Sequence, residues 1–237
     1  MASVHLSVNL IVLAPAAALS AMLVIHAARK RGKINTLALV AIALPFFWGR
    51  ELWAMNENMY VFQKGALTIW NVRVVGIIGW FFAVTTSLAL AEGIIRKNFP
   101  RHVNGVFATL SLSGLVTMAI ADIMETAAQG MGLWTPSAEG LRAFPAVFHG
   151  AQWFTPAWVS TVMLFLLPYL ATCSIFRALP GLAPRWRIPG QILLNAALLL
   201  FLAFLTLVVI GPPATALLPV LCILFSFLPG VKKLRYR

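Results

Sequence analysis

Residues 103–127 read VNGVFATLSLSGLVTMAIADIMETA, an apolar stretch long enough to cross a bilayer that nevertheless ends with two acids, Asp122 and Glu125. A membrane-spanning helix needs about 20 mostly apolar residues. A third acid, Glu51, lies near the end of another such stretch, although the whole chain has only six Asp and Glu among its 237 residues. Because charge is costly in hydrocarbon, acids in such places usually face an interior cavity and serve a function.

The rest of the chain repeats this pattern of long apolar stretches separated by short charged ones. It is 61% hydrophobic and 10% charged, and its apolar runs are continuous rather than alternating, which favours helices over membrane strands. We therefore predict an all-α polytopic membrane protein that forms a single domain over residues 1–237. Its seven transmembrane helices are expected at about 6–28, 34–55, 74–95, 103–127, 153–176, 190–210 and 213–229.

The basic residues predict the orientation of these helices. Of the 18 Lys and Arg, 14 fall in the first, third and fifth predicted loops and in the C-terminal tail: Arg29, Lys30, Arg31, Lys33, Arg96, Lys97, Arg101, Arg177, Arg185, Arg187, Lys232, Lys233, Arg235 and Arg237. The positive-inside rule then places the N-terminus outside and the C-terminus in the cytoplasm. The net charge of +12 is thus an orientation signal that favours contact with membrane lipids, and we expect no nucleic-acid partner.

This orientation brings Glu51, Asp122 and Glu125 to one depth near the outer end of the helices. The spacing of three between Asp122 and Glu125 puts them on the same helix face. Two carboxyl groups so close in an apolar medium do not both ionise easily, so one is expected to keep its proton and act as a general acid. The alternative is a structural cluster in which Arg50 and Arg73 neutralise the acids near the membrane surface.

The two longest predicted connections, 56–73 and 128–152, lie at the same end and resemble the rim of a site. Candidates for binding a substrate or tuning the acids are Arg50, Asn56, Asn71, Arg73, Trp134, His149 and Trp153. Several tryptophans gather there, which an interfacial aromatic belt would explain. An aromatic cavity that stabilises cations is the alternative.

Outside this cluster the sequence predicts little chemistry. Glu92 lies near the opposite end of its helix, where Arg96 four residues later makes a structural pair the favoured interpretation. The histidines and cysteines show no spacing typical of a metal site, so we predict no metal.

The motif Asp122-Ile-Met-Glu125, followed by Gly132-Leu-Trp134 and by Phe148-His-Gly-Ala-Gln-Trp153, resembles one family. These are the integral-membrane carotenoid end-group hydratases, in which an Asp and a Glu near the end of a middle helix precede a Leu-Trp pair. A Glu in an early helix completes the polar set there, and Glu51 fits that role. A looser similarity is to the small seven-helix membrane terpene cyclases.

The resemblance implies an enzyme of isoprenoid or carotenoid biosynthesis, which we expect in the cytoplasmic membrane of a prokaryote. Asp122 and Glu125 would share the general-acid role in hydrating a terminal double bond, and Glu51 would stabilise charge or orient water. Arg50 and His149 would tune the acids, and no cofactor is needed because hydration involves no redox change. The alternatives are a cyclase with the same acid chemistry, a proton-coupled transporter and a non-catalytic membrane subunit.

Overall fold

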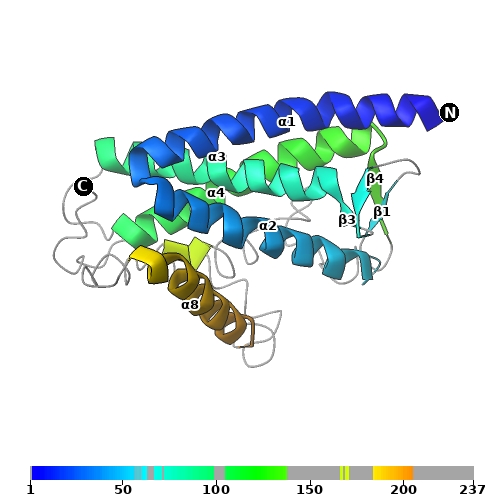
Figure 1. Cartoon of the computed structure of the whole chain (residues 1–237). Coiled ribbons are helices and arrows are strands. Elements are labelled where there is room, and N and C mark those ends of the chain that lie inside the picture. The colour runs from blue at the N-terminus through cyan, green and yellow to red at the C-terminus, as the bar shows by residue number, and fades with distance from the viewer. Residues whose placement is uncertain are drawn as a thin grey trace.

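A computed structural model of the chain describes residues 2–56, 58, 60–62, 67–70, 72–98, 105–137, 166–167, 169–170 and 184–204. Its helices are α1 (Ala2–Arg31), α2 (Lys33–Asn56), α3 (Val74–Asn98), α4 (Gly105–Gly130) and α8 (Pro184–Phe204), shown in Figure 1. The prediction of a mostly helical protein is confirmed for these residues. Within the described residues, three spans are long and apolar enough to cross a membrane: Lys33–Asn56, Val74–Ile95 and Ala108–Gly130.

The remaining predicted helices are covered only in part. Those at 153–176 and 213–229 lie almost wholly outside the described residues. The helix predicted from residue 190 begins earlier, at Pro184. Proline is favoured in the first turn of a helix, where its missing N–H costs nothing, so Pro184 starts the helix within the basic stretch that we had assigned to a loop.

The first four helices run up and down along one another (Figure 1). Only Gly32 separates α1 from α2, and its φ of 88° lies in the left-handed region that glycine adopts without strain. The Gly32 carbonyl then accepts hydrogen bonds from the Thr36 backbone N–H and from the Thr36 hydroxyl. This tight turn sets α2 antiparallel to α1.

Among the described helices, α3 and α4 have the most extensive contact. Each carries small buried residues at every fourth position, namely Gly79, Ala83, Ser87 and Ala91 on α3, and Thr109, Ser113, Thr117 and Ala121 on α4. Residues four apart share a helix face, and small side chains let membrane helices approach closely. These two stripes let α3 and α4 pack closely against each other.

Two small antiparallel sheets lie at one end of the helices, which we call the strand end. β1 (Tyr60–Phe62) pairs with β4 (Trp134–Pro136), and β2 (Thr68–Ile69) pairs with β3 (Val72–Arg73). The β1–β4 pair joins the two long connections, and the Ser137 hydroxyl donates a hydrogen bond to the Asn58 carbonyl beside it. Strands of two or three residues have no readable periodicity, so our sequence analysis missed them.

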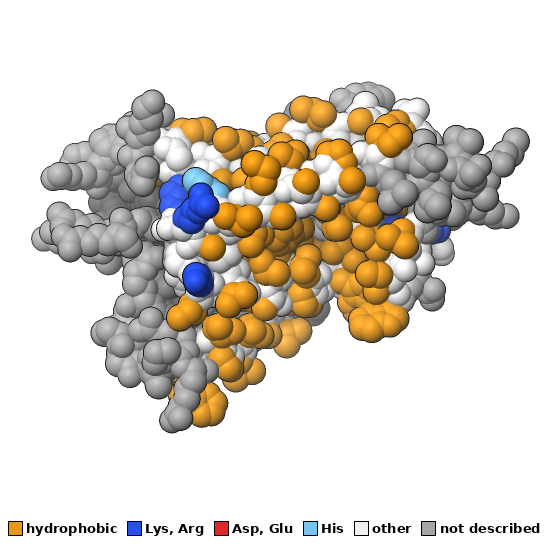
Figure 2. All heavy atoms as spheres, turned by 45° about the horizontal axis from the view of Figure 1, so that its top comes forward, with side chains coloured by type: hydrophobic (Ala, Val, Ile, Leu, Met, Phe, Trp, Pro, Cys, Tyr) orange, Lys and Arg blue, Asp and Glu red, His pale blue; other side chains and the backbone are white. Residues whose placement is uncertain are grey.

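Hydrophobic side chains cover much of the surface that Figure 2 shows, with Lys, Arg and His gathered mainly at one end. We call this the basic end; it carries Arg29, Lys30 and Lys33 where α1 meets α2, opposite the strand end. Large side chains such as Ile11 and Met22 on α1 are 70% and 65% exposed. An apolar surface of this extent fits a protein embedded in a membrane.

Candidate functional site

A cavity of about 180 Å³ lies at the strand end between α2, α3 and α4. We call it the acid cavity. Its charged lining residues are Arg50, Glu51 and Glu125. The rest of its lining is apolar, aromatic or glycine: Phe62, Val75, Gly76, Gly79, Trp80, Ala83, Ala121, Met124, Ala127, Ala128, Met131, Leu133 and Trp134.

Glu51 is held in this cavity by its neighbour on α2. Its side chain is only 3% exposed, and its Oε1 lies 2.8 Å from Nη1 of Arg50. The Arg50 guanidinium also stacks on α3, with its central carbon 3.9 Å from the centroid of the Trp80 ring. The salt bridge, buried against an aromatic face, therefore ties α2 to α3 and fixes where the Glu51 carboxylate lies.

The position of Glu51 also depends on a glycine across the helix interface. A Cβ atom added to Gly76 of α3 would lie 2.7 Å from Oε2 and 3.0 Å from Cδ of Glu51. Any larger residue there would require the Glu51 carboxylate, which Arg50 holds, to shift. Glycine is thus required at position 76 because the Glu51 side chain approaches it closely. The missing Cβ atom is what matters here, and the conformational freedom of the glycine backbone is not needed.

Glu125 enters the same cavity from α4. It is partly buried, and the Trp134 side chain, whose only donor is the indole N–H, hydrogen-bonds to its carboxyl group. Glu51 and Arg50 both act on Glu125 electrostatically, which places the three groups near one another. Trp134 is itself 6% exposed on β4 and is paired in register with Phe62 on β1. The strand pairing therefore positions the donor to Glu125.

The other predicted site residues are distributed as follows. Asp122 lies on α4 three residues before Glu125, but its side chain is outside the described part of the structure. Asn56 is exposed at the end of α2, and Arg73 lies over the Phe62 ring at 5.4 Å, behind the cavity wall. Asn71, His149 and Trp153 are outside the described residues.

Several residues that shape the site were not predicted from the sequence, above all Trp80, Gly76 and Phe62. Trp80 follows Gly76 by four residues in an apolar helix, and this spacing was the available signal for a shared face. The tryptophans divide between the two predicted roles, an interfacial membrane belt and the lining of a cavity. Trp53 and Trp70 are 49% and 80% exposed, as a membrane belt requires, whereas Trp80 and Trp134 line the cavity.

The arrangement can carry acid–base chemistry. Two carboxyl groups from different helices lie beside an apolar volume, one in a salt bridge and one hydrogen-bonded to an indole. Within the described residues no group of three His, Cys, Asp or Glu is placed to hold a metal ion.

No protein-family model matches the chain, and neither a characterised protein nor a solved structure matches it. The resemblance to carotenoid hydratases therefore stays a prediction. A fold alone does not define a function, so the function has to be inferred from the acid cavity.

Replacing Gly76 with Ala should destabilise the protein, because the new methyl group displaces a carboxylate that Arg50 holds. The expected loss is about 1–3 kcal/mol in the free energy of unfolding, typical of overpacking. Gly79→Ala is the matched control, since its Cβ would meet only the terminal Cε of Met124 at 3.1 Å, which can move aside. Both changes gain the same helix propensity, so their difference isolates the contact.

Chemical unfolding in mixed micelles measures both variants. Shortening the acid in Gly76→Ala/Glu51→Asp should restore part of the lost stability. Equal stability of the two single alanine variants would contradict the placement of Glu51.

Proposed function

We propose that the chain is an integral membrane enzyme that adds water to a terminal double bond of an isoprenoid lipid, with a carotenoid end group as the foremost candidate. One observation carries the proposal: Glu51 and Glu125 reach one cavity from different helices, and the walls around them are apolar. Such walls suit a hydrocarbon chain, and the chemistry then needs only a proton donor and a carboxylate.

In the proposed reaction, Glu125 donates its proton to the less substituted carbon of the alkene, which leaves a tertiary cation on the neighbouring carbon. Glu51, the carboxylate of the salt bridge, stabilises this cation and accepts a proton from water as the water oxygen bonds to the cationic carbon. Proton transfer from Glu51 back to Glu125 restores the enzyme. Asp122, one turn earlier on α4, is a second candidate for the acid. The net change is the addition of one water, so no cofactor is required.

Cyclisation by the same acid is the main alternative, and the position of Arg50 argues against it. Cyclases stabilise their cations on open aromatic faces, but the guanidinium of Arg50 covers one face of Trp80. That face is therefore unavailable to stabilise the further cations that a cyclisation forms after the first one. The carboxylates are then the groups best placed to stabilise the cation, which favours capture by water beside them.

A proton-coupled transporter is less well supported. A relay needs ionisable groups along the membrane path. On α3, Glu92 lies 16 residues from Gly76, which is about 24 Å along the helix. Within the described spans, Glu51 and Glu125 lie together near one end, and no acid links them to Glu92.

The proposal includes the orientation inferred from the basic residues. Seven helices would cross the cytoplasmic membrane of a prokaryote, with the N-terminus outside and the strand end facing the outer half of the bilayer. The substrate would enter the acid cavity from that half.

Expression in a lycopene-making host tests the reaction directly. The intact protein should yield a carotenoid heavier by one water, as measured by mass spectrometry. Glu125→Gln, which keeps the shape but removes the acid, should reduce this product by about 10²–10⁴-fold. Asp122→Asn tests the second candidate acid in the same assay, and thermal stability in detergent confirms that each variant is folded.

An unchanged product mass with altered retention would indicate cyclisation instead of hydration. Full hydration by both acid variants would rule out the proposed mechanism.

The end of the cavity should limit how far the substrate can enter. Ala83 and Ala121 are the lining residues of α3 and α4 farthest from the strand end, and Ala121 lies four residues, about 6 Å, before Glu125. Ala121→Leu would fill this end, so the reacting double bond could not reach Glu125. Product should fall by about a hundredfold, because small misplacements of a reacting group are costly.

Ala119→Leu is the matched control, since Ala119 is exposed on the same helix and lines no part of the cavity. It should leave product formation unchanged. Equal activity of the two leucine variants would show that the substrate does not occupy this end of the cavity.

A further inference from the structure

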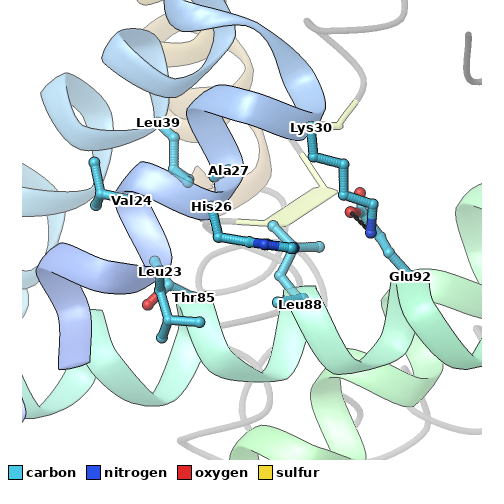
Figure 3. A pocket seen from close by; sticks show the side chains of 10 residues that line it. Leu23, Val24, His26, Ala27, Lys30, Leu39, Thr85, Leu88 and Glu92 are labelled. Carbon is cyan, nitrogen blue, oxygen red and sulfur yellow. Dashed lines mark ion pairs between the residues drawn. The ribbon is translucent and has the colours of Figure 1, made fainter.

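A second, small cavity of about 20 Å³ lies at the basic end between α1 and α3, with Leu39 of α2 at its side. Figure 3 shows its side chains: Leu23 and Val24 contribute from α1, Leu88 from α3. We call it the basic-end cavity. The proposed reaction does not use this cavity. Its lining includes a partly exposed cation, Lys30, whereas the cation of the acid cavity, Arg50, is largely buried.

The charged groups at its mouth come from facing helices. Nζ of Lys30 lies 3.7 Å from Oε2 of Glu92, and their side chains are 28% and 10% exposed. Charge-assisted hydrogen bonds are usually about 2.7–2.9 Å long, so this ion pair is loose. Glu92 thus contacts α1, while the Arg96 side chain, its predicted partner on α3, lies outside the described part of the structure. The Lys30 ammonium keeps an accessible side toward the surroundings.

His26 adds a second donor on the same helix face. It precedes Lys30 by four residues, so the two side chains are neighbours on α1. Figure 3 shows His26 extending from α1 toward Leu88 on α3, beside the Lys30–Glu92 pair. An anionic group at the mouth of the cavity could therefore meet an ammonium and an imidazole N–H together.

The surroundings match the two parts of a lipid. Arg29 and Lys33 are exposed at the same end, so among the described side chains there three are basic and one, Glu92, is acidic. Figure 2 shows hydrophobic side chains directly beside this group of Lys, Arg and His. Basic residues at the edge of an apolar membrane surface attract anionic headgroups by about 1 kcal/mol each.

We propose that one anionic phospholipid binds at the mouth of the basic-end cavity, where its phosphate contacts Lys30 and His26 while an acyl chain begins against Leu23 and Ala27. Glu92 orients the Lys30 side chain toward the mouth of the cavity. The inference is independent of the proposed reaction, because it needs only that this end of the helices lies at a headgroup layer.

Native mass spectrometry of the purified full chain, titrated with phosphatidylglycerol or phosphatidylcholine, tests this site. The protein should retain one phosphatidylglycerol more tightly than phosphatidylcholine. Lys30→Gln should weaken retention of phosphatidylglycerol by about fivefold, corresponding to one lost headgroup contact. Lys33→Gln removes the same charge from an exposed residue that does not line the cavity, and it should have much less effect.

Ala27→Leu gives a second test that keeps every charge, since Ala27 lines the cavity and a larger side chain would exclude the acyl chain. It should weaken retention of both lipids. Equal loss in the two lysine variants would indicate diffuse attraction to the basic end and overturn the proposal. Undiminished retention in Lys30→Gln, or no preference for phosphatidylglycerol in the unaltered chain, would overturn it as well.

Discussion

The salt bridge between Arg50 and Glu51, stacked on Trp80, is the interaction on which the acid cavity depends. It connects α2 to α3 within a largely apolar interior, where leaving either charge without its partner costs about 3–5 kcal/mol. The contact fits because Gly76 leaves room for the carboxylate and because the Trp80 ring offers a flat surface to the guanidinium. Each of these conditions is local, yet together they decide how α2 and α3 pack.

The second half of the cavity depends on pairing between distant segments. β1 and β4 bring the two long connections together, and this places Trp134 where its indole can donate to Glu125. The small residues on α3 and α4 let these helices pack closely on the side of the cavity that faces the basic end. The helices therefore provide the carboxyl groups, while the short strands complete the wall.

The described long helices, and the positions of the acids along them, could be predicted from the sequence because both follow from local composition. Apolar length defines a membrane helix, and charges within such lengths are rare enough to indicate a site. The expected depth of Glu51 and Glu125 followed from counting residues along antiparallel helices. Arg50 and Trp134 entered the candidate set for their place near the same end.

The details that fix the geometry were not predictable in this way. Adjacent residues on a helix do not normally face each other, so the contact between Arg50 and Glu51 depends on how the long arginine side chain bends over α3. Neither the role of Trp80 nor the pairing of Lys30 with Glu92 follows from spacing within one helix. Both are tertiary contacts, which a single sequence does not encode in a readable pattern.

Glu51 and Glu125 line the same cavity, and a double-mutant cycle on their stability tests this placement most directly. The free energy of unfolding would be measured for Glu51→Gln, Glu125→Gln and the double variant. Groups that act on each other should show a coupling of about 0.5–3 kcal/mol. Additivity within about 0.3–0.5 kcal/mol would instead mean that the two acids are independent, which would contradict a shared acid cavity.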